Sequence, residues 1–148
     1  MVELLLAAGA DATRLGVGRW VLHPRLSRLL ADHGAAIDSS GSWIGASCTG
    51  NQGRKDDPEF VRALLRHGAR ATDRRSGEPG ETAGVGALNA TALHFAAKAG
   101  FVETIKVLLE HGADPQARDS RGRTPLDWLD QAAPSAPRAA VRELLEGR

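Results

Sequence analysis

The sequence has little cysteine and few aromatic residues. Its 148 residues contain one cysteine, Cys48, no tyrosine and 4% aromatic residues in all. A lone cysteine excludes an internal disulfide, so the chain neither requires nor indicates an oxidising compartment. The scarcity of aromatic side chains leaves little for stacking bases, which argues against a protein that binds single-stranded nucleic acid.

An excess of charge of one sign is also missing. The 19 Lys and Arg residues stand against 18 Asp and Glu, which gives a formal net charge of +1, and the two signs are interleaved along the chain. A protein that binds phosphates usually carries a clear basic excess or a basic stripe. We therefore expect no nucleic-acid partner.

Long hydrophobic runs are absent as well. No stretch reaches the ~18 apolar residues of a membrane-spanning helix, so we expect no span. The first residues, MVELLLAAGAD, have no basic segment and predict a helix that ends in a glycine turn instead of a signal peptide. These features predict a cytoplasmic protein, and we expect a monomer.

What the sequence does contain is a pair of short amphipathic segments within residues 91–116. Small and apolar residues fill 92–97, and residues 102–109 carry apolar side chains on one helical face. Gly100 separates the segments, and Gly112 stands where a helix end needs a residue that tolerates positive φ. Each helix is near or below the ~12–15 residues at which an isolated helix is marginal in water. Both must therefore bury their apolar faces against similar neighbours.

The letters of this unit resemble the ankyrin repeat. TALHFA at Thr91–Ala96 differs from the family's TPLHxA signature by Ala92 in place of proline, and the later GADPQAR is similar to the family's GADVNA turn. A second copy, GRTPLDWL, follows at Gly122–Leu129, with Thr124 as N-cap and Pro125 at the first helical position. The resemblance implies an all-α solenoid of paired antiparallel helices joined by hairpin loops.

Turn glycines divide the chain into one irregular stack over residues 1–148. They lie 25, 34 and 44 residues apart, against a family period of about 33: Gly9, Gly34, Gly68 and Gly112. We predict degraded repeats over 1–40, a repeat over 41–72, a flexible insertion over 73–88, the best repeat over 89–117 and a capping repeat over 118–148. The chain opens inside a repeat, which we expect to reflect truncation of a longer protein. The alternative is a first helix that caps the stack alone.

Two further helices are predicted outside the best repeat. One begins at Pro58, with Asp57 as its N-cap. The other covers Arg138–Glu146 and closes the stack. Its buried face is predicted to consist of Val141, Leu144 and Leu145. The side chains predicted to face water, as a terminal repeat requires, are those of Arg138, Arg142, Glu143 and Glu146.

No set of side chains predicts catalysis or metal binding. Three histidines recur just before the turn glycine of successive units, which repetition explains better than a ligand cluster: His33, His67 and His111. The resemblance implies that His94 hydrogen-bonds to the Thr91 hydroxyl and to neighbouring turn backbone. Asp127 and Asp130, three residues apart on a helix, are expected to be solvated surface acids. We therefore expect no enzyme, no cofactor and no metal.

The resemblance implies a binding surface instead. In ankyrin proteins, partners are bound by the hairpin tips and by the exposed side of the inner helices, which line a concave groove. Carried onto this sequence, those positions are Lys98, Ala99, Ser120, Arg121, Arg123 and Gln131. Trp128 either packs in the core, which we favour, or is an exposed anchor. We expect a non-enzymatic module that binds a protein partner; the alternative is a structural or regulatory repeat segment of a larger protein.

Arg121 and Arg123 flank Gly122 in the turn of the last hairpin. A guanidinium forms paired hydrogen bonds with a carboxylate, so exposed arginines at this turn favour an acidic protein surface as partner. On this interpretation, alanine at both positions would weaken partner binding without lowering the melting temperature.

Overall fold

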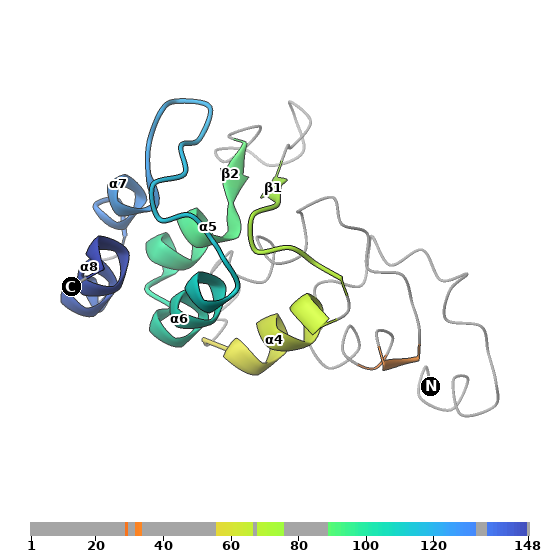
Figure 1. Cartoon of the computed structure of the whole chain (residues 1–148). Coiled ribbons are helices and arrows are strands. Elements are labelled where there is room, and N and C mark those ends of the chain that lie inside the picture. The colour runs from red at the N-terminus through yellow and green to blue at the C-terminus, as the bar shows by residue number, and fades with distance from the viewer. Residues whose placement is uncertain are drawn as a thin grey trace.

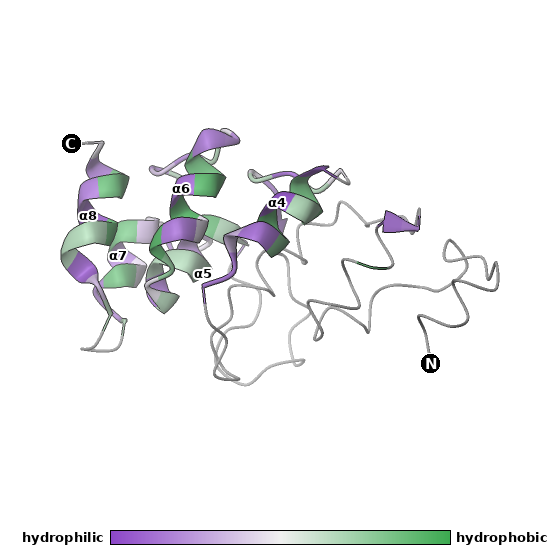
Figure 2. Cartoon of the chain, turned by 90° about the horizontal axis from the view of Figure 1, so that it is seen from below, coloured by the Kyte–Doolittle hydropathy of each residue, from purple (hydrophilic) through white to green (hydrophobic). Residues whose placement is uncertain are grey.

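The structure of this chain, a computed structural model, describes residues 29, 32–33, 56–66, 68–75, 89–132 and 136–147. Its principal elements are, in order, α4 (Pro58–Arg66), β1 (Arg74–Arg75), β2 (Ala90–Thr91), α5 (Ala92–Ala99), α6 (Val102–Glu110), α7 (Pro125–Leu129) and α8 (Arg138–Glu146). Figure 1 shows the helices stacked beside one another, with the two short strands above them. In Figure 2, α4, α6 and α8 form an outer row and α5 and α7 form an inner row.

This architecture confirms the predicted all-α class. The two strands contribute only two residues each, while the five helices carry the stack. None of the described helices is long and apolar enough to cross a bilayer.

Two neighbouring carboxylates start two different helices. Oδ1 of Asp57 accepts a hydrogen bond from the Phe60 N–H at 3.0 Å, so Asp57 caps α4 as predicted. The Asp56 carboxylate instead accepts from the N–H groups of Glu103 at 2.8 Å and Thr104 at 3.1 Å, at the start of α6. The Thr104 hydroxyl donates to the same carboxylate at 2.6 Å. A side chain that precedes α4 therefore caps the outer helix of the next unit.

Glycines in the left-handed conformation stand at the ends of several helices, among them α5, α6 and α8. Gly100, with φ of +74°, follows α5, and its N–H donates to the carbonyls of the last turn. A Cβ atom at Gly100 would lie 2.8 Å from Cδ of Pro137, so this position needs glycine for space as well as for conformation. Gly112, with φ of +82°, confirms the predicted stop after α6.

The core lies between the two rows of helices. Leu93 of α5 and Ile105 and Leu108 of α6 are completely buried. Helix α6 also buries Thr104 and Val107. These two residues lie outside the apolar face predicted from the sequence, which consists of Val102, Ile105, Leu108 and Leu109. The reason is that α6 contacts α4, α5 and α8, so more than one of its faces is covered.

Helix α8 closes the described part of the stack. It covers Arg138–Glu146, the predicted range. Val141 and Leu145 are buried and Leu144 is half-buried, while the charged side chains of Arg142 and Glu143 are exposed. The predicted division of this helix into a buried and a polar face is confirmed.

The predicted flexible insertion at 73–88 begins inside a structured element. Arg74 and Arg75 form β1, which pairs antiparallel with β2 in the register Arg74↔Thr91 and Arg75↔Ala90. Two residues are too few to show a strand period in the sequence, and their partner lies beyond the intervening segment. Residues 76–88 lie outside the described residues, as do the predicted repeats over 1–40 apart from positions 29, 32 and 33.

Candidate functional site

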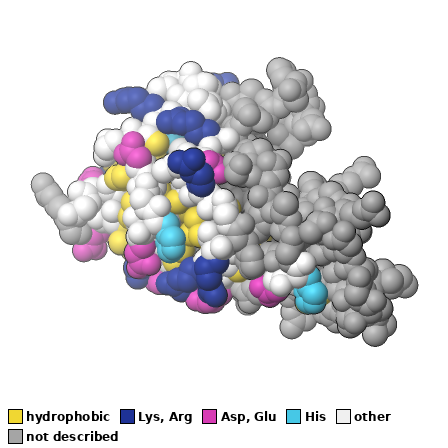
Figure 3. Space-filling model, turned by 45° about the vertical axis from the view of Figure 1, so that its right-hand side comes forward, with side chains coloured by type: hydrophobic (Ala, Val, Ile, Leu, Met, Phe, Trp, Pro, Cys, Tyr) yellow, Lys and Arg dark blue, Asp and Glu magenta, His cyan; other side chains and the backbone are white. Residues whose placement is uncertain are grey.

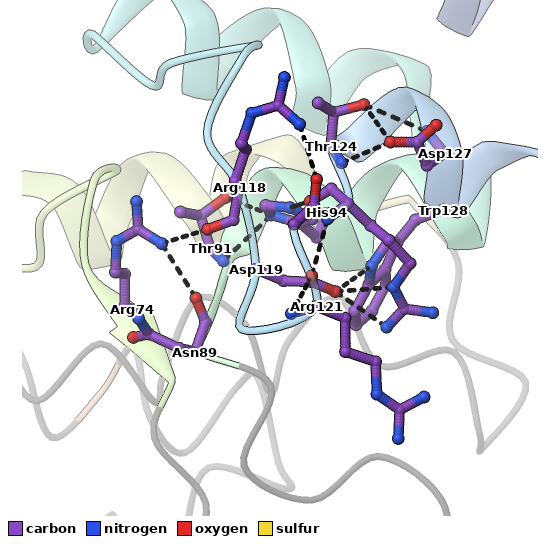
Figure 4. A network of polar contacts seen from close by, with 12 residues as sticks. Arg74, Asn89, Thr91, His94, Arg118, Asp119, Arg121, Thr124, Asp127 and Trp128 are labelled. Atoms are coloured by element: carbon purple, nitrogen blue, oxygen red, sulfur yellow. Dashed lines mark hydrogen bonds and ion pairs between the residues drawn. The ribbon is translucent and has the colours of Figure 1, made fainter.

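His94 joins α5 to the hairpin that follows α6. Its Nδ1 lies 2.9 Å from the Thr91 hydroxyl and 3.2 Å from the Thr91 N–H. Its Nε2 lies 3.0 Å from the carbonyl oxygen of Arg123. A carbonyl only accepts and a backbone N–H only donates, so the proton sits on Nε2 and Nδ1 accepts. The hydrogen bonds implied for His94 by the resemblance are confirmed, and one of them reaches the next unit (Figure 4).

The imidazole of His94 is held neutral. Burial lowers the pKa of His94 below its ordinary value of 6.5, although the Arg123 carbonyl acts in the opposite direction. Both ring nitrogens are already engaged in hydrogen bonds within the protein. In the part of the chain that the structure describes, no group of three or more His, Cys, Asp and Glu side chains is placed to hold a metal ion.

Asp119 is a fully buried carboxylate at the base of the same hairpin. It accepts hydrogen bonds from the Arg121 N–H at 2.8 Å, the Arg123 N–H at 2.9 Å and the Trp128 indole at 2.9 Å. The Arg123 guanidinium adds contacts at 2.9 and 2.8 Å. Burial on its own would raise the pKa of Asp119, but these donors together lower it to about 2. The carboxylate is therefore ionised at neutral pH and organises the turn around itself.

Trp128 of α7 packs at the centre of this network. The side chain is 2% exposed and lies edge-to-face against His94 and Phe95, with ring centroids 5.4 and 5.1 Å apart. The Arg123 guanidinium lies 5.3 Å from the centre of the indole ring and the Lys98 ammonium 5.8 Å. Of the two interpretations of Trp128, the core residue is therefore right.

Arg123 turns inward, contrary to the expectation that it projects from an exposed turn. Its side chain is 24% exposed and is paired with the buried Asp119 carboxylate. The sequence shows two arginines around a glycine, but only Arg123 has both a buried acid and an indole ring within reach. Arg121 is exposed, as expected. Alanine at both positions would therefore lower the melting temperature, because Asp119 would stay buried without its guanidinium partner.

The other predicted site residues lie at or near the surface. Lys98 is exposed in the last turn of α5, and Ala99 beside it is half-buried. Ser120 and Arg121 are exposed in the hairpin turn, and Gln131 is exposed just beyond α7. The structure brings Lys98 close to the last hairpin, since its ammonium shares the Trp128 ring with the Arg123 guanidinium.

Sequence reasoning missed two arginines of the hairpins. Nη1 of Arg74, on β1, donates to the carbonyl oxygens of Asn89 at 3.1 Å and Arg118 at 2.7 Å. Nη1 of Arg118 donates to the carbonyl of Gly122 at 2.8 Å. Arg74 and Arg118 are both exposed. The only signal in the sequence was the number of arginines in the two turns. Their contacts could not be predicted from it, because they form between two hairpins that lie side by side in the structure, as Figure 4 shows.

The two surface acids of α7 serve local structure. The Asp127 carboxylate accepts from the Thr124 N–H at 2.7 Å and the Thr124 hydroxyl at 2.9 Å, which lowers the pKa of Asp127. Asp130 lies 3.4 Å from the Arg142 guanidinium of α8. Both acids are exposed, as predicted, and their contacts are structural.

Comparison with known proteins gives the family. A family model described as "Ankyrin repeats (3 copies)" matches residues 51–147. The BTB/POZ domain and ankyrin repeat-containing protein NH5.2 of Oryza sativa subsp. japonica is 41% identical over 71 residues, which are 48% of this chain and 13% of that protein. CAP-Gly domain-containing linker protein 3 of Homo sapiens is 31% identical over 150 residues, 96% of this chain and 26% of that protein. The chain thus spans between 13% and 26% of the length of these relatives.

Proposed function

This chain belongs to the ankyrin-repeat family, whose repeats are generally protein-interaction modules, and we propose that it binds a protein partner. The partner contacts the hairpin tips and the exposed side of the inner helices α5 and α7. The surface in question includes Lys98, Ser120, Arg121 and Gln131, which are all exposed.

The observation that carries this proposal is the rigid frame beneath that surface. The Asp119 carboxylate, the His94 imidazole and the Trp128 ring tie α5, α7 and the hairpin between α6 and α7 into one unit. Among the described residues, no buried side-chain nitrogen or oxygen lacks a hydrogen-bond partner. A frame of this kind presents its exposed side chains in fixed positions, which reduces the ordering cost of binding.

We propose that the module has no catalytic activity of its own. The buried titratable side chains of the frame, His94 and Asp119, are engaged in hydrogen bonds that hold the hairpin. A general base needs a lone pair directed at a substrate proton, and the lone pair on Nδ1 of His94 already accepts from Thr91. The cytoplasmic location and the monomeric state stay predictions.

One observation favours the second function, a structural or regulatory segment that packs against a neighbouring domain. The relatives carry this region as a minor part of much longer chains, 13% and 26% of their lengths. In that case the same exposed surface would be covered within one chain, and not by a separate protein.

Site-specific photo-crosslinking tests the proposal. A crosslinking amino acid at Lys98 or Gln131, on the inner side, should capture one defined partner from cell extract. The matched control position is Lys106, which is exposed on α6 in the outer row and pairs with Glu103 at 2.8 Å. Capture of the same protein from Lys106 and not from Lys98 or Gln131 would contradict the proposed surface.

A further inference from the structure

Among the residues that the structure describes, many of the cations on the outer helices are paired with carboxylates, whereas most of those on the hairpins are not, and this difference points to a ligand. On the outer helices, Arg66 and Arg138 form no ion pair among the described residues, but the other three cations lie beside carboxylates: Arg62 with Glu59 at 2.6 Å, Lys106 with Glu103 at 2.8 Å and Arg142 with Asp130 at 3.4 Å. On the last hairpin, Arg123 is likewise paired with Asp119. The charge of each of these paired groups is compensated within the protein.

Four exposed arginines of the hairpins, Arg70 among them, form no ion pair with a carboxylate that the structure describes, although the charge of Arg118 helps to lower the pKa of Asp127. Three of the four define an arginine edge. This arginine edge consists of Arg74, Arg118 and Arg121. Arg74 and Arg118 donate to backbone carbonyls, which orient a guanidinium but do not cancel its formal charge. The Arg121 side chain makes no hydrogen bond or ion pair with any other residue that the structure describes, and in Figure 4 it points away from the network.

The hairpins concentrate positive charge that the chain as a whole lacks. Residues 69–75 and 113–124 together hold six arginines and three aspartates, a net charge of +3 against +1 for the whole chain. Of the three acids, Asp119 is buried against Arg123, Asp73 is half-buried and Asp114 is exposed. In Figure 3, several Lys and Arg side chains lie in the upper part of the face shown, and a second group lies at its lower edge beside Asp and Glu side chains.

Two of the three guanidiniums of the arginine edge, those of Arg74 and Arg118, are also held in place before any ligand arrives. Arg74 of one hairpin is bonded to the backbone of the next at 2.7 Å, and that backbone is fixed in turn by the Asp119 carboxylate. Side chains that are ordered in advance lose less entropy on binding. The N–H groups of Arg74 and Arg118 not used for carbonyls, and the whole Arg121 guanidinium, remain as donors of the planar, paired type that suits a carboxylate.

Other polyanions fit this edge less well. Nucleic acid binding relies on many phosphate contacts and on exposed aromatic side chains for bases. Here the edge has three guanidiniums. Of the described aromatic side chains, those of Trp128, Phe60 and Phe95 are at most 5% exposed, and Phe101, just before α6, is half-buried. A few carboxylates on a peptide match both the number and the geometry of the donors.

We propose that the arginine edge binds an acidic peptide segment of the partner, rich in Asp and Glu and long enough to reach both hairpins. This inference rests on the proposed function, and it states which chemical groups of the partner contact the arginine edge. Lys98 and Gln131, on the inner helices, lie outside the edge and contact other parts of the partner.

Fluorescence anisotropy with synthetic peptides tests the assignment on the full chain. The probe is a labelled peptide of Asp, Glu, Gly and Ser, and its control carries Asn and Gln at the acidic positions. We expect the acidic peptide to bind at least about tenfold more tightly than the amide peptide, the factor that a charge-assisted hydrogen bond supplies. Its affinity should fall with added salt.

Variants then locate the site. Arg121→Glu should weaken the acidic peptide by about tenfold or more, while its melting temperature stays unchanged, because Arg121 makes no internal side-chain bond. Arg142→Glu, an equal charge change on the outer row, should alter the affinity by less than about twofold, since surface charges at a distance are screened. Arg121→Gln serves as the second variant if the reversal disturbs folding.

Several results would overturn the inference. They are equal affinity for the acidic and amide peptides, no binding of either, equal losses in Arg121→Glu and Arg142→Glu, and tighter binding of a single-stranded RNA of the same charge. If the crosslinking position at Lys98 still captures a partner while the acidic peptide fails to bind, the inference falls and the proposed function stands. If no position on the inner side captures a partner, the proposed function itself falls.

Discussion

The inner and outer sides of the stack are held together by different forces. On the inner side, α5, α7 and the hairpin between α6 and α7 meet around a buried carboxylate, a neutral imidazole and an indole ring. On the outer side, α6 contacts α4 and α8, and apolar side chains of these helices such as Ile105, Leu108 and Val141 are completely buried. Hydrophobic burial is non-directional and insensitive to pH, whereas a buried ion pair requires one geometry and one protonation state. The inner side, which also buries Leu93 and Leu129 completely, therefore fixes shape through directional contacts, and the outer side is held mainly by apolar burial.

The largest loss of stability is expected when the buried carboxylate of the inner side is removed. Asp119→Ala leaves the Arg123 guanidinium and the Trp128 indole without their acceptor in a buried site, and should cost about 3–5 kcal/mol of unfolding free energy. Urea denaturation measures the loss. The matched control is Asp130→Ala, an exposed acid whose partner lies 3.4 Å away, which should cost less than about 0.5 kcal/mol. Similar losses for the two would mean that the hairpin does not depend on its buried ion pair.

On the outer side, the corresponding test is a substitution that creates a cavity in the apolar core. Leu108→Ala removes a fully buried side chain of α6 and should destabilise by about 2–5 kcal/mol through lost transfer energy and a residual cavity. Unlike Asp119→Ala, this variant should leave the dependence of stability on pH unchanged. A flattened pH profile in Leu108→Ala would show that the two sides are not held by separate forces.

The two sides should also differ in how their stability depends on pH, because the titratable groups His94 and Asp119 belong to the inner side. The pKa of His94 in the folded chain lies below 6.5, so the unfolded chain binds a proton at a higher pH than the folded chain does. The contribution of His94 to the free energy of unfolding is therefore complete above pH 6.5 and is lost as the pH falls. Asp119 has a folded pKa of about 2 against 3.8, so its contribution is lost only below about pH 4. Urea midpoints between pH 7 and pH 5 should fall for the parent chain and fall less for His94→Gln. His111→Gln, which replaces an exposed histidine that hydrogen-bonds to the Val107 carbonyl at 2.8 Å, is the control for the substitution itself.

The smallest effect is expected from the outer-helix cap. Asp56→Ala removes three hydrogen bonds at the start of α6 and should cost about 1 kcal/mol, the typical value for an N-cap. Asp57→Ala, which removes the cap of α4, is the natural comparison. Hydrogen exchange at the Thr104 amide should accelerate in Asp56→Ala and not in Asp57→Ala. The reverse would place the cap of α6 elsewhere.

Local sequence signals predicted the helices well. The apolar positions of α6, its glycine stop at Gly112 and the bounds of α8 follow from periodicity and capping, which depend on neighbours within one turn. The resemblance to the repeat signature also gave the partners of His94. In each case the interacting residues are close in sequence or occupy a repeated place.

The candidate site was less predictable because it depends on contacts across turns and repeats. Nothing in the letters SRGR shows that Arg123 folds back on the Trp128 ring while Arg121 projects outward. The contact between Arg74 and the Arg118 carbonyl joins residues 44 positions apart. Side-chain direction at a turn is set by what lies beneath it, so it becomes visible only when the hairpins are placed side by side.

The Asp56 cap has a consequence for how the stack comes apart. Because the carboxylate that satisfies the first amides of α6 precedes α4, fraying at the start of α4 would also uncover donors in the following unit. In a linear array, such a shared group raises the coupling between neighbours relative to the stability of each alone. The cooperative unit of unfolding then does not coincide with one sequence repeat. It contains α4, the outer helix of one repeat, together with α6, the outer helix of the next. Loosening that starts on one side of the α4–α6 boundary would pass to the other through a single side chain.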